Sequence, residues 1–370
     1  MKEIINKIVF VITIAMIIVG NLWFSFHKPI SFSEQENRYL QMFPKLSLKK
    51  LAEGKLTSDI EDYINDQFPM RDTLVGIKTN VEIMLGKRKI NDIYIAKDDY
   101  LIPAFNKNND SNLIIKALNE FVREVEIPVD LLIAPNAIEI YSDKLPDNDE
   151  IDNGIEEIDN IYQNFEGKEI DVHNLFLNIK DEVDLYYRTD HHWTTYGAFY
   201  AYNQYLAKIG KPSRKITDYN VELASNQFYG TSYSKANYYS VKPDEVYLFS
   251  DSNNYRVKYV VENKIESSLY NRDYLDKKDK YSVFLDNNHA LIEIDNLNNN
   301  SGENLLVIKN SYGNSFAPFV AADFDNVTVA DLRYYSGSLS EYAKLNNITR
   351  VLVLYDINGI YTDASILKLR

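Results

Sequence analysis

The chain has 370 residues, of which 45% are hydrophobic and 25% are charged, a composition typical of a folded protein with one large or two modest domains. Its formal net charge of -14 argues against nucleic-acid binding, because neutralising phosphates requires clustered Lys and Arg. The absence of Cys excludes disulfides, thiolate nucleophiles and zinc sites ligated by Cys. Any nucleophile must therefore be a hydroxyl group or an activated water.

The N-terminal region contains an apolar run from Ile8 to Phe26, which follows Lys2 and Lys7 and has no charged residue. About 20 apolar residues suffice for a helix to cross the roughly 30 Å of a bilayer's hydrocarbon core. A cleaved signal peptide is the alternative, but the end of the run offers no clear small-x-small cleavage site. We therefore predict a membrane anchor over residues 1–28, with the remainder extracellular in a single-pass protein. Cleavage would make the protein secreted.

Residues 29–95 are expected to form a helical lead-in between this anchor and the main domain. Thr57 to Asn65 carries apolar residues four positions apart, which is the spacing of one helix face. Asp72 to Leu85 resumes a helical pattern, and Gly86 is a typical helix terminator. We assign these helices a scaffold role.

Residues 96–370 alternate short apolar strands with helices, which predicts an α/β domain of three layers with a sheet covered on both faces. A helix is predicted over Ser111 to Val125, and an apolar strand follows over Val129 to Ala134. Asn136 comes just after the carboxyl end of that strand, where sites form in such sheets. Asn136 is thus a candidate donor to a bound oxyanion, although a turn is the commoner place for such an Asn.

The stretch from Tyr187 to Tyr202 concentrates ionisable and aromatic groups at the start of a predicted helix. Asp190 and His192 are two residues apart, so in an extended segment their side chains leave the same face, whereas His191 points the other way. A carboxylate that orients an imidazole makes His a competent general base near neutral pH. Asp190 and His192 are therefore the candidate orienting acid and general base.

A candidate nucleophile follows the predicted strand Asn304 to Lys309. Ser311 lies in a strand-turn-helix pattern, which exposes a hydroxyl above the sheet and directs free backbone N–H groups toward a ligand. We expect the N–H groups of Tyr312 and Gly313 to hold an oxyanion. On spacing alone, a Ser in this position is more often a turn or helix cap. Ser232 is a rival nucleophile, but no apolar strand delivers it to a sharp turn.

These motifs together resemble the bacterial DHHW protein family, which is related to the alginate O-acetylation proteins within the SGNH/GDSL hydrolase-like superfamily. The resemblance rests on the stretches Gln35-Glu-Asn-Arg38, Asp66-Gln-Phe-Pro69, Asp190-His-His-Trp193, Asn310-Ser-Tyr-Gly-Asn-Ser315 and Asp331-Leu-Arg-Tyr-Tyr335. It implies a flavodoxin-like, SGNH hydrolase-like α/β domain over residues 96–370. In that domain Ser311, His192 and Asp190 would move an acetyl group onto or off a secreted polysaccharide.

Three further residues are candidate substrate contacts. Trp193 completes the Asp-x-His-Trp motif of the related acetylation proteins, and Asn314 lies just beyond the nucleophile position. Arg333, near a predicted strand end, either pairs with a polar substrate or bridges surface carboxylates.

The chain departs from the superfamily's usual pattern at three points. Lys309-Asn310-Ser311 stands where that pattern has Gly-Asp-Ser. Asp-x-His replaces Asp-x-x-His, which makes His191 an alternative base. Asp and His also precede Ser in the chain, as they do in the acetylation proteins.

Two classes of function remain open. An O-acetyltransferase would pass the acetyl group from Ser311 to a hydroxyl of a secreted or cell-wall polysaccharide, and an acetylesterase would pass it to water with the same residues. The other class is a non-catalytic polysaccharide-binding or assembly protein. We expect no cofactor, and a metal site of Asp190, His191 and His192 is disfavoured because adjacent His side chains diverge. The resemblance also implies a partner, a multi-spanning membrane acyltransferase that supplies the acetyl groups.

Overall fold

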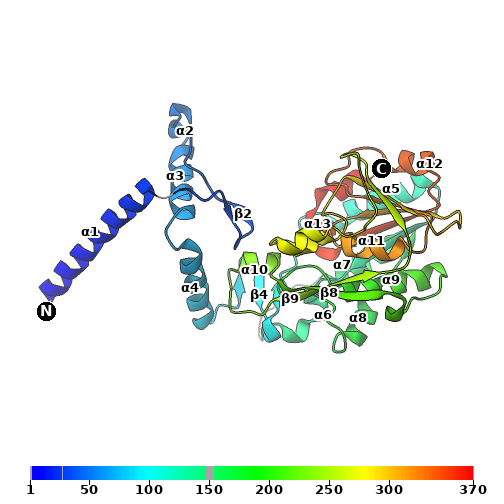
Figure 1. Ribbon diagram of the computed structural model, residues 1–370, viewed down its shortest axis with the longest axis horizontal. Helices are drawn as coiled ribbons and strands as arrows, with labels where there is room; N and C mark the ends of the chain where they lie inside the picture. The colour runs from blue at the N-terminus through cyan, green and yellow to red at the C-terminus, as the bar shows by residue number, and fades with distance from the viewer. Residues whose placement is uncertain (1, 27, 147–153, 370) are drawn as a thin grey trace. The chain divides into compact units, whose positions relative to one another are not determined.

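The computed structural model describes residues 2–26, 28–146 and 154–369 of the chain. The chain divides into two compact units, which are described separately (Figure 1). One unit comprises Met1–Lys87 and Asn237–Tyr239, and the other comprises Arg88–Ala236 and Ser240–Arg370.

The smaller unit is mainly helical. Its elements are α1 (Lys2–Phe26), β1 (Phe32–Ser33), β2 (Arg38–Tyr39), α2 (Leu48–Ala52), α3 (Lys55–Asp66) and α4 (Arg71–Met84). The helices predicted over Thr57 to Asn65 and Asp72 to Leu85 are confirmed as α3 and α4. Gly86 follows α4 with a φ of +96°, a left-handed conformation that Gly adopts without steric cost.

The two N-terminal family motifs meet in this unit. Arg38 of β2 donates from Nη2 to Asp66 Oδ1 at the end of α3, over 2.5 Å. Arg71 donates to Glu36 over 2.8 Å. The side chain of Gln67 is buried and is hydrogen-bonded to backbone groups through both its oxygen and its nitrogen. These motifs therefore hold two segments of the unit together.

The apolar run at the N-terminus is helical, as part of α1. Within the part of the chain that the structure describes, however, no helix is long and apolar enough to cross a membrane. The membrane anchor predicted over residues 1–28 is therefore not supported, and residues 1 and 27 of that range lie outside the described residues.

The larger unit is built around an eight-stranded mixed sheet in the order β11-β10-β12-β14-β13-β15-β6-β7. Its strands are β6 (Val129–Ala134), β7 (Lys168–Glu169), β10 (Tyr255–Tyr259), β11 (Lys264–Glu266), β12 (Leu291–Asn296), β13 (Asn304–Lys309), β14 (Asn326–Ala330) and β15 (Arg350–Asp356). The strands from β14 to β7 are parallel, and β12, β10 and β11 extend one edge with antiparallel pairing. Two small antiparallel sheets contain β3 (Lys89–Ile90), β4 (Ile93–Ile95) and β5 (Leu101–Pro103), and β8 (Asn220–Phe228) and β9 (Asp244–Ser250).

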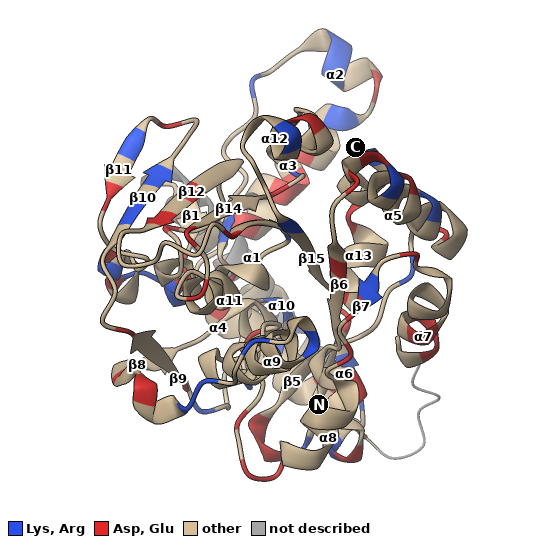
Figure 2. Ribbon diagram, turned by 90° about the vertical axis from the view of Figure 1, so that its right-hand side faces the viewer, with Lys and Arg blue, Asp and Glu red and all other residues tan. Residues whose placement is uncertain are grey.

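Helices cover both faces of the sheet, as the alternation of elements predicts for three layers. They are α5 (Ser111–Val125), α6 (Ala137–Ile140), α7 (Ile155–Asn164), α8 (His173–Ile179), α9 (Thr195–Ile209), α10 (Thr231–Ala236), α11 (Gly313–Val320), α12 (Leu339–Leu345) and α13 (Ile357–Thr362). Neighbouring residues of β13 point to opposite layers: Val307 packs in the core with α9 and α11, and Leu306 in the core with α5 and α12. Figure 2 shows α9 and α11 on one side of β15 and β6, and α5 and α7 on the other.

The strand order differs from the flavodoxin-like arrangement that we expected. A flavodoxin-like sheet has its parallel strands in the order 2-1-3-4-5, whereas here β15, the last parallel strand in the sequence, lies between β6 and β13. The antiparallel edge is a second difference. Sequence periodicity identifies buried strands but not their neighbours, because strand order depends on pairing between distant segments.

The parallel register places the site at one edge of the sheet. Lys309, the last residue of β13, pairs with β15, and Ala134, the last residue of β6, lies opposite Asp356 of β15. The carboxyl ends of these strands therefore share an edge, where ligands bind in open α/β sheets. Asn136 and Ser311 follow two of these strand ends.

Candidate active site

Ser311 occupies the turn that connects β13 to α11. Its Oγ lies 2.8 Å from His192 Nε2, although 119 residues separate the two in the sequence. Ser311 also lines a pocket of about 460 Å³. The turn is closed by Asn310, whose carbonyl and side-chain oxygens accept the N–H groups of Gly313 and Tyr312, at 3.0 and 3.2 Å.

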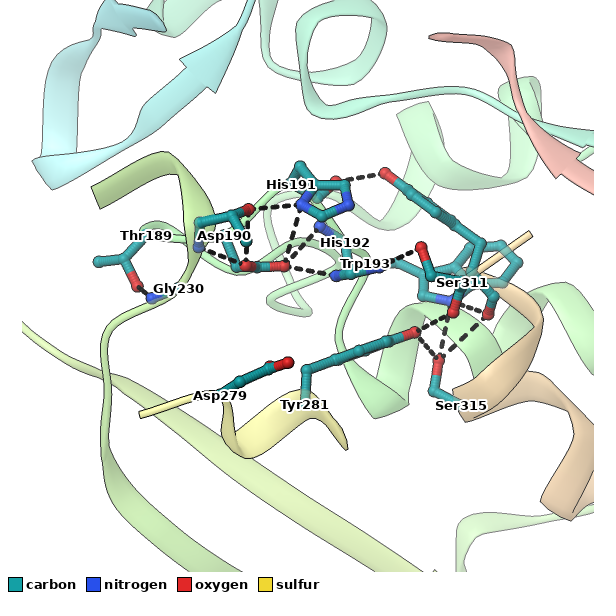
Figure 3. A network of polar contacts seen from close by, with 12 residues as sticks. Thr189, Asp190, His191, His192, Trp193, Gly230, Asp279, Tyr281, Ser311 and Ser315 are labelled. Carbon is teal, nitrogen blue, oxygen red and sulfur yellow. Dashed lines mark hydrogen bonds and ion pairs between the residues drawn. The ribbon is translucent and has the colours of Figure 1, made fainter. Parts of the chain in front are cut away.

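A tight loop carries Asp190 and His192. Tyr186 pairs with Trp193 in an antiparallel bridge, and the residues between them turn back on themselves. This geometry places the Asp190 carboxylate beside the His192 ring, with Oδ1 2.5 Å from Nδ1 (Figure 3). Because a carboxylate only accepts, Nδ1 carries the ring proton, and Nε2 is left to accept the hydroxyl proton of Ser311.

The Asp190 carboxylate is buried but well supplied with donors. Oδ1 accepts the backbone N–H of His192 at 3.0 Å, and Oδ2 accepts the backbone N–H of Thr231 at 2.7 Å and its hydroxyl at 3.0 Å. Burial alone would raise the pKa of Asp190, but the adjacent His191 and His192 and these hydrogen bonds hold it well below its usual range. Gly230 packs directly on this carboxylate, since a Cβ there would lie 2.2 Å from Asp190 Oδ2.

The ring of Tyr281 fixes the other side of His192. The two rings stack at a centroid distance of 3.7 Å and an angle of 8°. The Tyr281 hydroxyl lies 3.0 Å from both the Ser311 carbonyl and Ser315 Oγ, so this side chain connects the base to the turn that holds the nucleophile. Sequence reasoning missed Tyr281 because it lies in an irregular region without periodicity.

Asp244, at the start of β9, is hydrogen-bonded to the loop that carries Asp190 and His192. Its carboxylate accepts the backbone N–H of Arg188 at 2.8 Å, and the backbone N–H and hydroxyl of Thr189 at 2.8 and 2.6 Å. Burial raises the pKa of Asp244 to about 6, against the lowering effect of these donors. No pattern in the sequence pointed to this residue.

Comparison with known proteins identifies the family. A family model described as DHHW protein matches residues 105–330, more than half of the chain. The chain belongs to the DHHW protein family. The family predicted from the sequence motifs is thereby confirmed.

Two solved structures support the fold. The chain is similar to a DHHW family protein from Eubacterium siraeum, with 24% identity, a TM-score of 0.67, and coverage of 76% of this chain and 96% of that one. It is also similar to Bacillus cereus PatB1, solved with a sulfonyl adduct, with 22% identity, a TM-score of 0.63, and coverage of 75% and 98%. The O-acetyltransferase domain of Pseudomonas putida AlgJ matches with 12% identity, a TM-score of 0.46, and coverage of 74% and 93%. No curated protein matches the sequence.

The four residues of the DHHW motif lie in different environments. Asp190 and His192 form the contacts described above, and His191 lines the pocket. Trp193 is fully buried, and its indole N–H lies 3.1 Å from the Tyr312 carbonyl and 2.9 Å from a Ser side-chain oxygen of α11. Our expectation that Trp193 contacts substrate is therefore corrected, because its ring belongs to the core and supports the turn after the nucleophile.

The other two candidate substrate contacts also differ from each other. Asn314 is 1% exposed and is not among the residues that line the pocket. Its side-chain amide donates to Asn288 at 3.1 Å. Our expectation that Asn314 contacts substrate is therefore corrected as well. Arg333 does line the pocket, and it also pairs with Asp331 through Nε and Nη2, at 2.9 and 2.6 Å. The carboxylate that pairs with Arg333 is fully buried, so Arg333 does not bridge surface carboxylates there, and its contact with a polar substrate stays a prediction.

The expected oxyanion donors are engaged elsewhere. The N–H groups of Tyr312 and Gly313 bond to Asn310, as described above, because its side chain closes the turn on itself. The amide of Asn136 donates to the Tyr312 hydroxyl at 2.8 Å and to a buried Asp at the end of β15 at 2.9 Å. Among the described residues, the Ser311 N–H has no hydrogen-bond partner. This N–H, which sequence reasoning did not select, is the available donor in the turn.

The departure from Gly-Asp-Ser also has a structural account. Lys309 is fully buried and its Nζ lies 3.2 Å from an Asp331 oxygen. Burial lowers the pKa of Lys309 to about 8, although Asp331 acts in the opposite sense. Gly313 packs against the Lys309 side chain, and a larger residue would not fit there, since a Cβ at this position would lie 2.6 Å from Lys309 Cβ. The family stretch that begins at Asp331 therefore anchors the strand end before the nucleophile.

The structure also bears on two alternative assignments, namely Ser232 as the nucleophile and a metal site at Asp190, His191 and His192. Ser232 lines the pocket and is 1% exposed, but His192 hydrogen-bonds to Ser311 and not to this rival. Asp190, His191 and His192 each offer a metal-ligand atom, all within 4.8 Å of one another. Both nitrogens of His192 are hydrogen-bonded, so either would have to give up its partner to bind a metal.

Proposed function

We propose that the protein is an O-acetyltransferase that acetylates a hydroxyl of a secreted or cell-wall polysaccharide, with Ser311 as nucleophile, His192 as general base and Asp190 as the residue that orients the base. One observation carries this proposal: the unbroken chain of contacts from Asp190 Oδ1 through both His192 nitrogens to Ser311 Oγ, at 2.5 and 2.8 Å. A nucleophile within hydrogen-bond reach of an oriented base is the arrangement that acyl transfer uses.

The reaction takes two steps. Ser311 Oγ attacks the carbonyl carbon of the acetyl donor, and its proton passes to His192 Nε2 and then to the leaving group. An acceptor hydroxyl next attacks acetyl-Ser311, its proton passes to His192 Nε2, and Ser311 Oγ recovers that proton as its bond to the acetyl group breaks. We assign to the Ser311 N–H the stabilisation of the oxyanion of each tetrahedral intermediate.

The donor and the location of the reaction belong to the same proposal. We place the larger unit outside the cell, where a secreted polymer is available, and assign the supply of acetyl groups to a multi-spanning membrane acyltransferase. The sequence resemblance supports this assignment. Protease treatment of intact cells tests the location: the larger unit should be degraded while a cytoplasmic control protein survives.

Mass spectrometry of the purified protein after incubation with 4-nitrophenyl acetate tests the nucleophile. We expect one acetyl adduct in wild type and in Ser232→Ala, and none in Ser311→Ala. A sulfonyl fluoride is a second probe, since PatB1, which shares the fold, was solved with a sulfonyl adduct. Absence of both adducts from the wild type would favour the non-catalytic polysaccharide-binding class.

A chase of the acetyl-enzyme with acceptor then separates the two enzymatic alternatives. Acetylated glycan is the expected product. Free acetate alone, at every glycan concentration, would identify an acetylesterase with the same residues.

A further inference from the structure

His191 faces the same pocket as Ser311, yet the proposed acyl transfer does not use it. Its side chain is 36% exposed, whereas that of His192 is 7% exposed. The two imidazole rings lie 3.8 Å apart at their centroids, and both flank Asp190 (Figure 3). The site therefore presents a second imidazole to the pocket.

The protonation of His191 follows from its contact with Thr231. The Thr231 hydroxyl has a single proton and lies 3.0 Å from Asp190 Oδ2, which only accepts, so the hydroxyl donates there. The hydroxyl oxygen also lies 2.6 Å from His191 Nδ1. In that contact the imidazole must be the donor, and Nδ1 carries the ring proton.

The Nε2 atom of His191 is therefore a hydrogen-bond acceptor. A neutral imidazole with its proton on Nδ1 has a lone pair on Nε2. Partial burial of the ring and the neighbouring His192 lower the pKa of His191 to about 4, so the ring is neutral near pH 7. Among the residues that the structure describes, Nε2 has no hydrogen-bond partner. The pocket that Ser311 lines thus also contains an unused hydrogen-bond acceptor.

We propose that His191 Nε2 accepts a hydrogen bond from a hydroxyl of the acyl acceptor, adjacent to the hydroxyl that attacks. The attacking hydroxyl cannot fill this role, because its only proton passes to His192. The inference rests on the proposed function and names the acceptor class: an alcohol with neighbouring hydroxyls, as in a sugar ring. Water has no second hydroxyl, so this contact favours transfer over hydrolysis.

Two variants test the roles of the two ring nitrogens of His191 separately. The amide of His191→Asn reaches the position of Nδ1 and can still donate to Thr231, but it provides nothing at the position of Nε2. The longer His191→Gln places its amide oxygen near Nε2. The probes are 4-nitrophenyl acetate as donor and cis-1,2-cyclohexanediol and cyclohexanol as acceptors. Acetyl-enzyme formation and the yield of each ester are measured in the full chain.

Wild type should acetylate the diol about two- to tenfold better than cyclohexanol, since one hydrogen bond has roughly that effect. In His191→Asn the preference should fall to near unity while acetyl-Ser311 still forms within about threefold of the wild-type rate, because the contacts of the base remain. His191→Gln should recover most of the preference. A merely structural role for His191 would change both steps together.

Three results would overturn the inference. Wild type without a diol preference, or an equal preference in all three proteins, would show that Nε2 does not contact the acceptor. Loss of acetyl-enzyme formation in His191→Asn to the level of Ser311→Ala would make His191 the base instead. Absence of acetyl-enzyme from the wild type would be a different failure, since it removes the proposed function as well.

Discussion

At the scale of single residues, the site depends on the placement of one carboxylate. Asp190 accepts from the backbone and ring of His192 and from the backbone and hydroxyl of Thr231, so each of its oxygens is held by two donors. Its neighbour Gly230 has no side chain, and this allows the carboxylate to approach the backbone. A displaced carboxylate would misalign the base even if every reacting group remained present.

Substituting Gly230 tests this dependence. In Gly230→Ala the new Cβ would lie 2.2 Å from Asp190 Oδ2 and 2.3 Å from its Cβ, so the carboxylate must move. We expect acetyl-enzyme formation to slow about 100-fold, because a displacement of about 1 Å has an effect of that order. The rate is measured with 4-nitrophenyl acetate.

Gly302→Ala is the matched control for this substitution. A Cβ added at Gly302 would meet no other atom within 4 Å, and the residue has a φ of +80°. The control should lose about 1 kcal/mol of stability, because Ala tolerates that φ poorly, but it should keep the wild-type rate. An unchanged rate in Gly230→Ala would mean that the loop adjusts without moving the base.

Among the secondary-structure elements, strand β9 is hydrogen-bonded to the loop that carries the DHHW motif. Asp244 is the contact, and all of its partners are donors on Arg188 and Thr189. In Asp244→Asn the amide nitrogen cannot accept, so at least one donor stays buried and unpaired. We expect a loss of about 1–3 kcal/mol in the free energy of unfolding, measured with denaturant at pH 7. Glu245→Gln, at the exposed neighbour, should stay within about 0.5 kcal/mol of wild type.

The same contact predicts a pH dependence. The folded pKa of Asp244 is about 6, above the value of about 3.9 in unfolded chains. Between these two pH values the folded state binds a proton on Asp244 that the unfolded state does not bind. This protonation stabilises the folded state, and its contribution to stability is lost as pH rises through about 6. The difference in unfolding free energy between wild type and Asp244→Asn should widen as pH falls from about 6 to about 4. A constant difference over this range would contradict the assignment.

At the scale of the whole molecule, the site belongs to one of the two units. Asp190, His192 and Ser311 all lie in the unit of Arg88–Ala236 and Ser240–Arg370, as do the residues that line the pocket. A chain that begins at Arg88 should therefore form acetyl-Ser311 within about twofold of the full-length rate, because it retains the contacts of the site and of the core beneath it. A folded truncated protein without activity would show that the N-terminal unit contributes to the chemistry.

Features that depend on a few consecutive residues could be predicted from the amino-acid sequence alone. Helices α3, α4 and α5 follow from apolar spacing, and the three-layer arrangement follows from the alternation of strands and helices. The motif pointed to Asp190 and His192, and the turn after a buried strand pointed to Ser311. Residue chemistry and local backbone geometry suffice for such predictions, since each concerns a few consecutive residues.

Features that depend on contacts between distant segments could be read only from the folded structure. The place of β15 between β6 and β13, the stacking of Tyr281 on His192 and the burial of Trp193 join residues far apart in the chain. The same holds for the oxyanion donor, since packing determines which N–H groups are already bonded. A motif specifies which groups are present, whereas their orientation and exposure are set by the surfaces that pack around them.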